Sequence, residues 1–336
     1  MAAKQADGRK TVVVKTAATA KKSVTARKPA ATQKTTVART ATAKSATART
    51  GRPVGVPKTY KLYIGGKYPR SESGRSFEVL AADGTFVANA SLASRKDLRE
   101  AVVVARKAFA GWSSATAYLR GQILYRVAEM LDGRRSQFVD ELVTLGATGR
   151  AAEAEVDAAV ATWIYYAGFA DKYAQIVGAA NPVAAPYFNF SLPEATGVVG
   201  IVAPQSTDQS LVGLAATVAP AVMSGNTVVV LASESNPLTA ISFAEVLGTS
   251  DVPGGVINVL TGKLSELAPV LASHMDVNAL DLAGIAADAT TELERAAADN
   301  LKRVVRPRAL DTRGGGDLES ITSFTELKTV WHPIGV

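Results

Sequence analysis

Gly197-Val-Val-Gly-Ile-Val-Ala-Pro204 and Thr227-Val-Val-Val-Leu231 are two short, uninterrupted apolar runs rich in valine. Runs of this length, bounded by glycine, proline or polar residues, are typical of strands that are buried on both faces. The residues between them, as far as Met223, have the composition of a helix. A strand, a helix and a second strand in this order predict a parallel sheet.

The same alternation continues toward the C-terminus. Pro237 follows Asn236 at the expected first position of a helix, and Val256–Leu260 and Ala279–Leu282 are predicted to be the third and fourth strands. With further helices expected near residues 264–273 and 287–300, we predict a Rossmann-like, doubly wound α/β domain. Ligands of such sheets bind beyond the carboxyl ends of the strands. These ends are predicted at residues 203–208, 232–235, 261–263 and 283–285.

Upstream of these strands, the pattern predicts two smaller β elements and a helical region. Tyr60–Ile64 alternates like a short strand, and Ser76–Ala90 is expected to form a hairpin around Asp83-Gly84. Ser94 and Asp97 have the spacing of a capping box at the start of a helix. Apolar stripes at helical spacing follow, at Leu98, Ala101, Val102, Ala105 and Phe109, and then at Leu119, Ile123, Val127 and Leu131.

The composition excludes several kinds of chemistry. The 336 residues include 37 basic and 30 acidic side chains, two histidines and no cysteine, which excludes disulfides, thiolate zinc sites, iron–sulfur clusters and a cysteine nucleophile. His274 and His332 are isolated, so we expect no metal site. Apolar runs are broken well before the roughly 18 residues of a membrane span. We therefore expect a soluble, cytoplasmic protein.

The charge is concentrated in the first 57 residues. They hold 13 basic side chains and one acid, Asp7, for a net charge of +12, whereas residues 58–336 carry −5. The segment has no aromatic residue and no sustained apolar face, so we expect it to be a disordered tail. Its spaced cations suit non-specific binding of nucleic acid or another polyanion. A transit peptide and a solubilising tether are the alternatives.

In order and spacing, the strand region resembles the coenzyme domain of the aldehyde dehydrogenase superfamily. The resemblance extends from about Tyr60 to Val305 and resumes at Phe324–Trp331, which is similar to the terminal strand of that family. The stretches that carry it are Gly197–Pro204, Ala219-Pro220, Gly225–Val229, Ser233-Glu234, Pro237–Ala240, Pro253–Val259, Ala272–His274 and Asn300–Val304.

The resemblance implies that a domain is missing. In the family a catalytic domain of about two hundred residues, a full domain's worth, lies where this chain has only Pro307–Ser320. We therefore expect four segments. They are a disordered basic tail (1–57), a coenzyme-binding domain (58–305) with an oligomerisation hairpin near 186–202, a Gly-rich linker in place of the catalytic domain (306–320), and an oligomerisation strand (321–336).

The resemblance also implies that the catalytic groups are absent. The family's nucleophilic cysteine lies in the missing domain, and its general-base glutamate corresponds to Pro307. Its oxyanion-hole asparagine follows a Pro-Trp pair, where this chain has Pro204-Gln205-Ser206. Acyl transfer needs the nucleophile, the base and the oriented donors together. We expect a pseudoenzyme with no catalytic residue and no activity by itself.

The cofactor site of the family is matched only in part. The family's lysine near the adenosine ribose corresponds to Leu231, whereas Glu234 corresponds to the glutamate that binds the ribose hydroxyls. Gly262 matches a turn glycine, and Gly284 matches the glycine that approaches the pyrophosphate. The resemblance implies weak NAD(P) binding or none. The vestigial cofactor-binding residues are Ser233, Glu234, Gly262 and Gly284.

In the family, a projecting hairpin joins neighbouring subunits by docking on the partner's catalytic domain. Residues 186–193 followed by 195–202 resemble this hairpin, and residues 321–330 resemble the terminal strand. Because this chain lacks the docking domain, the resemblance implies a hetero-oligomer with a full-length aldehyde dehydrogenase. Two other functions stay open. One is association with nucleic acid through the tail, and the other is a residual nucleotide-binding oxidoreductase that uses Asp208 or Lys263.

Overall fold

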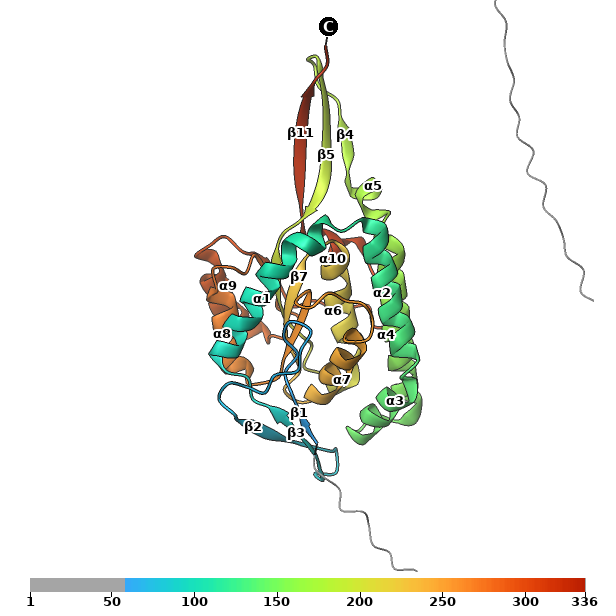
Figure 1. Ribbon diagram of the computed structural model, residues 1–336, viewed down its shortest axis with the longest axis vertical. Helices are drawn as coiled ribbons and strands as arrows, with labels where there is room; N and C mark the ends of the chain where they lie inside the picture. Colours follow the sequence, from blue (N-terminus) through green and yellow to red (C-terminus); the bar gives the residue numbers. More distant parts are fainter. Residues whose placement is uncertain (1–57, 336) are drawn as a thin grey trace, which may run out of the picture. The chain divides into compact units, whose positions relative to one another are not determined.

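The structure, a computed structural model, describes residues 58–335. The predicted basic tail, residues 1–57, lies outside the described residues. The strands form three sheets, with the orders β1–β3–β2, β10–β9–β6–β7–β8 and β11–β5–β4 (Figure 1). Their bounds are β1 (Thr59–Tyr60), β2 (Ser76–Leu80), β3 (Phe86–Ser91), β4 (Ala179–Asn181), β5 (Tyr187–Ala195), β6 (Val198–Val202), β7 (Thr227–Leu231), β8 (Ile257–Leu260), β9 (Ala279–Asp281), β10 (Arg303–Val305) and β11 (Thr325–Pro333).

The five-stranded sheet is parallel throughout, which confirms the predicted doubly wound α/β fold. The fifth strand, β10, was not among the predicted strands. Helices connect the strands. Their bounds are α1 (Arg95–Ser114), α2 (Ala117–Asp132), α3 (Arg135–Thr144), α4 (Gly149–Phe169), α5 (Tyr173–Val177), α6 (Val212–Met223), α7 (Pro237–Leu247), α8 (Leu264–Ser273), α9 (Thr290–Ala298) and α10 (Leu318–Thr322).

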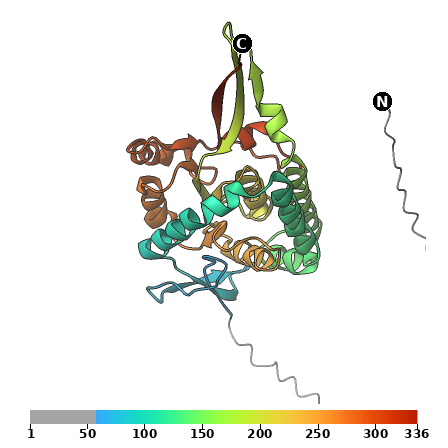
Figure 2. The same ribbon diagram turned by 45° about the horizontal axis from the view of Figure 1, so that its top comes forward.

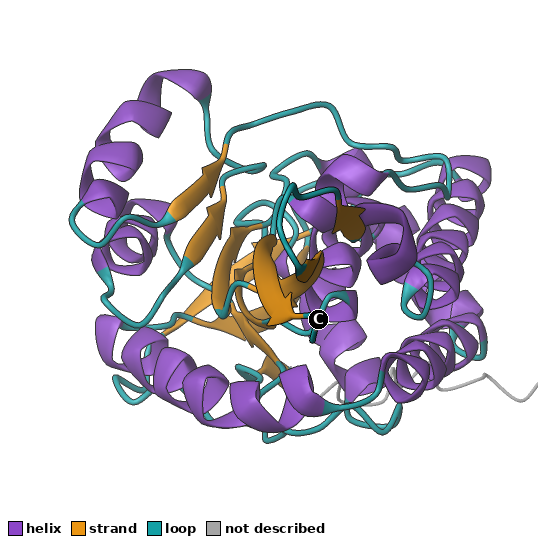
Figure 3. Ribbon diagram, turned by 90° about the horizontal axis from the view of Figure 1, so that it is seen from above, coloured by secondary structure: helices purple, strands orange, loops and turns teal. Residues whose placement is uncertain are grey.

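Both faces of the parallel sheet are covered by helices, as seen from above in Figure 3. Val198 and Val202 pack with α1, α8 and α9, whereas Val199 and Ile201 point to the other face and pack with α2, α4, α6, α7 and α10. Successive side chains of a strand point to opposite faces, so every residue of β6 is buried. This explains why the strand is a continuous apolar run.

The N-terminal β elements largely follow their sequence pattern. β2 and β3 form the predicted hairpin, with a positive φ of 82° at Gly84. The predicted strand Tyr60–Ile64 is wrong in extent, because the strand ends at Tyr60. Tyr63 instead forms an isolated antiparallel bridge with Val259 and covers the outer edge of β8. The chain then turns at Gly65, whose φ is +63°.

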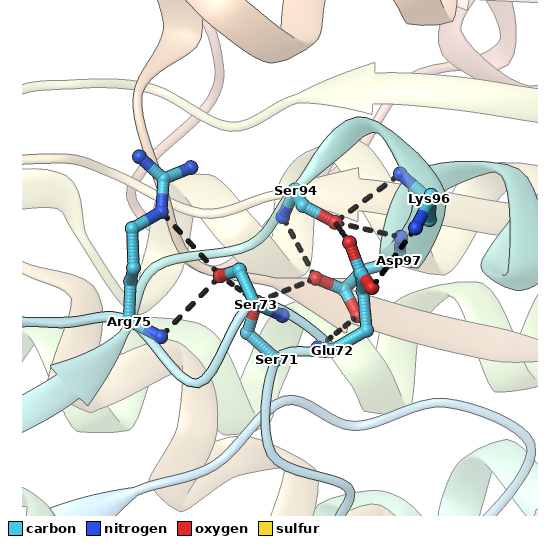
Figure 4. A network of polar contacts seen from close by, with 7 residues as sticks. All are labelled: Ser71, Glu72, Ser73, Arg75, Ser94, Lys96 and Asp97. Carbon is cyan, nitrogen blue, oxygen red and sulfur yellow. Dashed lines mark hydrogen bonds and ion pairs between the residues drawn. The ribbon is translucent and has the colours of Figure 1, made fainter.

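A polar network holds the start of α1, as Figure 4 shows. The predicted capping box is present, because the Ser94 hydroxyl accepts from the Asp97 amide and the Asp97 carboxylate accepts from the Ser94 amide. The same carboxylate accepts from the hydroxyl of Ser71 at 2.7 Å and from the amide of Glu72 at 3.0 Å. Glu72 and Lys96 form an ion pair at 3.3 Å. The loop before β2 is thereby fastened to the helix.

The third sheet extends away from the α/β body (Figure 2). The hairpin in it pairs β4 with β5, so the expected pairing of residues 186–193 with 195–202 is wrong. Residues 198–202 form β6, whose buried apolar side chains belong to the core. The expected terminal strand also begins later, because Ile321 is a fully buried residue of α10 and β11 starts at Thr325. β11 pairs with β5 over nine residues.

The segment expected as a Gly-rich linker packs against the helices. A Cβ atom on Gly314, whose φ is +88°, would lie 2.7 Å from the Cβ of Ala161. A Cβ atom on Gly316 would lie 2.6 Å from the ring of Tyr165. The two glycines therefore allow the chain to cross α4 at close range.

Candidate functional site

The candidate cofactor residues gather at the carboxyl-end edge of the parallel sheet. Ser233 and Glu234 follow β7, Gly262 follows β8 and Gly284 follows β9. Because parallel strands end at the same side of a sheet, the fold brings all four residues to one edge, where ligands of doubly wound sheets bind. Each of the four residues makes hydrogen bonds or close contacts with neighbouring loops.

Glu234 is bonded to the protein itself. Its carboxylate forms an ion pair with the Lys263 ammonium at 3.0 Å and accepts a short hydrogen bond from the amide of Leu264. Leu264 is the first residue of α8, so Glu234 caps the positive end of that helix. The carboxylate expected to contact a ribose is therefore engaged in holding β7 and α8 together.

Gln205 fastens the two neighbouring loops at this edge. Its side-chain oxygen accepts from the Glu234 amide at 2.9 Å, and its side-chain nitrogen donates to the Ala203 carbonyl at 2.6 Å. The Ser235 hydroxyl donates to the Gln205 carbonyl at 2.8 Å. Sequence reasoning did not include Gln205 among the site residues. Its only signal was its place in Pro204-Gln205-Ser206, directly after the first strand.

Gly284 lies beneath the same side chain. Its amide donates to the carbonyl of Val202 at 2.9 Å. A Cβ atom on this residue would lie 1.9 Å from the carbonyl oxygen of Ala203 and 3.1 Å from the side-chain nitrogen of Gln205. Glycine is thus required for the approach of these two loops, and Gln205 occupies the space above it.

Ser233 and Gly262 also serve the local structure. The Ser233 hydroxyl accepts from the amide of Asn236 at 3.2 Å, just before α7. A Cβ atom on Gly262 would lie 3.0 Å from a methyl group of Leu267 and 3.3 Å from the amide nitrogen of Ala93. The four residues do not leave free polar groups directed at one point. Because the polar groups of Ser233 and Glu234 are already engaged with the protein itself, these residues are a poor fit for a dinucleotide.

A buried ion pair closes the end of β9. Both carboxylate oxygens of Asp281, which is fully buried, accept from the Arg308 guanidinium at 3.0 Å. Burial raises the pKa of the Asp281 carboxyl, while the hydrogen bonds and charge of Arg308 act in the opposite direction. Arg308 follows Pro307, the residue that the resemblance aligns with the general-base glutamate. Sequence reasoning missed this pair, although an aspartate in an apolar strand was a signal that a partner was needed.

The two histidines and Asp208 are the remaining candidates. His274 follows α8 and His332 lies in β11, in two different parts of the fold. Asp208 accepts a short hydrogen bond from the Ser206 hydroxyl. Within residues 58–335, no three histidine, aspartate or glutamate side chains are gathered as metal ligands would be. In the same range, no helix has both the length and the apolar character that crossing a bilayer requires.

A second candidate surface is the β4–β5–β11 sheet, because it exposes apolar side chains on both faces. Phe188 and Leu192 lie on one face and are 51% and 47% exposed. Leu327 and Trp331, on the other face, are 59% and 58% exposed. Solvent-exposed apolar side chains of this size on one small sheet are typical of a surface that binds another protein.

Comparison with known proteins places these features in context. A protein-family model described as "Aldehyde dehydrogenase family" matches residues 68–306. Cytosolic 10-formyltetrahydrofolate dehydrogenase of Mus musculus is 33% identical over 258 residues, which cover 73% of this chain and 28% of that protein. "Aldehyde dehydrogenase, cytosolic 1" of Elephantulus edwardii is 32% identical over 250 residues, covering 73% of this chain and 49% of that protein.

Solved structures agree with the sequence relatives. PnpE in complex with nicotinamide adenine dinucleotide superposes with a TM-score of 0.68 at 28% identity, and a second structure, PnpE from Pseudomonas sp. WBC-3, superposes with a TM-score of 0.69 at 27% identity. The first match covers 73% of this chain and 50% of PnpE. The chain thus spans about half the length, or less, of the relatives that it matches.

Proposed function

Because this chain belongs to the aldehyde dehydrogenase family, we propose that it is a non-catalytic subunit that assembles with a full-length, NAD(P)-dependent aldehyde dehydrogenase. In this role it tunes the stability, placement or assembly of the active enzyme. We place the complex in the cytoplasm, where the names of two relatives put those proteins. The exposed apolar faces of the β4–β5–β11 sheet are the observation that carries the proposal.

The residues at the positions of the family's chemistry support a non-catalytic role. The chain has no cysteine to serve as a nucleophile. Pro307 stands where the resemblance places the general base, and the adjacent Arg308 is bound to Asp281. Gln205 stands near the position of the oxyanion-hole asparagine, and its side chain is hydrogen-bonded to neighbouring loops. The side chains of Arg308 and Gln205 are thus engaged with the protein itself, and the sequence offers no thiolate to act as the family's nucleophile.

The residues at the carboxyl-end edge of the parallel sheet are also the basis for a proposal about the cofactor. PnpE was solved with nicotinamide adenine dinucleotide, but in this chain the Glu234 carboxylate is engaged by Lys263 and Leu264. Leu231 replaces the family's cationic side chain and is buried. We therefore propose weak NAD(P) binding or none. Isothermal titration with NAD and NADP tests this, and submicromolar affinity would contradict it.

We propose that the partner is a full-length family member and not a second copy of this chain. The reason is the domain that the projecting sheet needs to contact. In the family, the hairpin contacts the catalytic domain of the neighbouring subunit. Residues 306–317 connect β10 directly to α10, so a second copy of this chain does not offer that domain. A full-length aldehyde dehydrogenase does offer it, which favours a hetero-oligomer.

Affinity purification of the tagged chain from its own host, followed by native mass spectrometry, tests the assembly. We expect a stoichiometric complex with a full-length aldehyde dehydrogenase. The double variant Phe188→Ser and Leu192→Ser is expected to lose the partner. A matched control, Tyr118→Ser, removes an exposed aromatic side chain from α2 and is expected to retain it. Recovery of the chain without any aldehyde dehydrogenase would overturn the proposal.

The charge of residues 1–57 favours a second candidate function, association with nucleic acid or another polyanion. A net charge of +12 with one acid suits non-specific binding to phosphates, which weakens steeply with salt. Duplex DNA binding measured between 50 and 200 mM salt, with and without residues 1–57, distinguishes this function from subunit assembly. Equal DNA binding by the truncated protein would remove the tail from the explanation.

A further inference from the structure

A cavity of about 450 Å³ lies between α3, the start of α7 and the strands β1 and β3, away from both candidate surfaces described above. One part of its wall is apolar and comes from Val87, Leu145 and Leu238. The ring of Tyr60 completes this part. Its volume lies within the range of about 300–1,000 Å³ that is usual for small-molecule sites.

A second part of the wall is acidic. It includes Asp140 and Glu141 of α3. One oxygen of the Glu141 carboxyl accepts from the Ser242 hydroxyl at 2.6 Å and from the Gln137 amide at 3.4 Å. The other oxygen, Oε2, is buried and has no hydrogen-bond donor. Burying a carboxylate oxygen without a donor is unfavourable, so Glu141 lacks a hydrogen-bond partner for this oxygen.

The aromatic part of the wall already contacts a cation. The ammonium of Lys58 lies 4.1 Å from the centre of the Tyr60 ring. That ammonium is paired with Glu245 at 3.3 Å, and its charge also acts on the Glu141 carboxyl, where it opposes the burial that raises the pKa of that group. Aromatic faces attract ammonium groups through their negative potential. The cavity therefore combines an aromatic ring, an under-bonded carboxyl and an aliphatic surface.

From this combination, we propose that the cavity binds a short primary alkylamine in its ammonium form. The ammonium donates hydrogen bonds to the Glu141 carboxyl, and the aliphatic chain packs on Val87, Leu145 and Leu238. Rotation about the last torsion of the glutamate, which has broad minima, turns Oε2 toward the ligand. A metal ion is a poorer fit, because no group of three potential ligands is found among the described residues.

Isothermal titration of the full-length protein with n-butylamine at pH 7.5 tests the proposal. The amine carries a positive charge at this pH, as a lysine side chain does. We expect saturable binding that is at least tenfold weaker for butan-1-ol, which has the same chain but no charge. Tetramethylammonium, which has charge but no N–H donor, is also expected to bind at least tenfold more weakly.

Two variants distinguish the contribution of the Glu141 carboxyl to binding from that of the Tyr60 ring. Glu141→Gln keeps the shape of the side chain and is expected to lower the affinity for butylamine at least tenfold. The matched control Glu153→Gln changes the same charge on an exposed position of α4 and leaves the affinity unchanged. Tyr60→Leu, which keeps the carboxyl, weakens binding severalfold. Absence of butylamine binding, or equal binding by the wild type and Glu141→Gln, would overturn the proposal, whatever the outcome for subunit assembly.

Discussion

At the carboxyl ends of β6, β7 and β9, the polar groups of Gln205, Glu234 and Asp281 are bonded to the protein itself. On the β4–β5–β11 sheet, large apolar side chains such as Phe188 and Trp331 are exposed to solvent. In a doubly wound domain the first region is the expected place for a ligand. In this chain the polar groups of the first region are engaged within the protein, whereas the apolar side chains of the second are exposed. This difference is the reason for the proposal that the chain binds another protein through the β4–β5–β11 sheet.

The largest effect is expected at the buried ion pair. Arg308→Met leaves the Asp281 carboxylate buried without its counter-ion, which should lower the free energy of unfolding by about 3–5 kcal/mol. Urea denaturation followed by circular dichroism measures the change. Arg306→Met is the control, because its pair with Glu294 involves an arginine that is mostly exposed, and it should lower the stability much less than Arg308→Met does. If both variants lower the free energy of unfolding by similar amounts, the pair of Asp281 and Arg308 does not hold the end of β9 as proposed.

Gly284→Ala tests the close approach of the loops at the same edge. The added methyl group would overlap the Ala203 carbonyl oxygen, and overpacking of this kind costs about 1–3 kcal/mol. Gly168→Ala, in α4, has open space around the added methyl group and should stabilise the helix by about 0.5–1 kcal/mol. Thermal unfolding of the two variants should therefore shift in opposite directions. A neutral Gly284→Ala would mean that the edge has room for a ligand.

Both carboxylate oxygens of Asp281 accept hydrogen bonds, whereas one oxygen of Glu141 accepts none. Glu141 is therefore expected to make the stability of the protein depend on pH. Burial raises the pKa of Glu141, although hydrogen bonds from Ser242 and Gln137 oppose the shift. A carboxyl with a raised pKa binds its proton more tightly in the folded state, so stability is greatest below the unfolded pKa and falls as pH rises through the folded pKa. Glu141→Gln should remove this decline and add about 1 kcal/mol at pH 7. Denaturation at several pH values between 4 and 8 measures this decline. If the free energy of unfolding of Glu141→Gln falls with pH as steeply as that of the wild type, the prediction is wrong.

The smallest effect on stability is expected on the β4–β5–β11 sheet. The double variant Phe188→Ser and Leu192→Ser should change the free energy of unfolding of the isolated chain by no more than about 0.5 kcal/mol per site, as is usual for exposed positions. The same variant is expected to lose its partner. A large loss of stability in the isolated chain would instead assign these side chains to the fold and weaken the assembly proposal.

The sequence was sufficient for the architecture of the α/β body. The valine-rich run of β6 and the helix-to-strand alternation after it predict a parallel sheet, since a strand covered on both faces must be apolar at every position. Ser94 and Asp97 predict the start of α1 because a capping box depends on residues three apart. The four cofactor positions were placed at one sheet edge by the resemblance, and the fold brings them there.

Only the tertiary structure decided how that edge and the projecting sheet are built. The pairing of Asp281 with Arg308, the bridge made by Gln205 and the nine-residue register of β11 on β5 join residues that are far apart in the chain or belong to different loops. The sequence analysis misplaced the projecting hairpin for the same reason. The apolar residues of a strand do not indicate whether the strand will pair in a hairpin or in a parallel sheet. Periodicity and caps are local properties of a sequence, whereas the partner of a buried charge or of a strand edge depends on which distant segments the fold brings together.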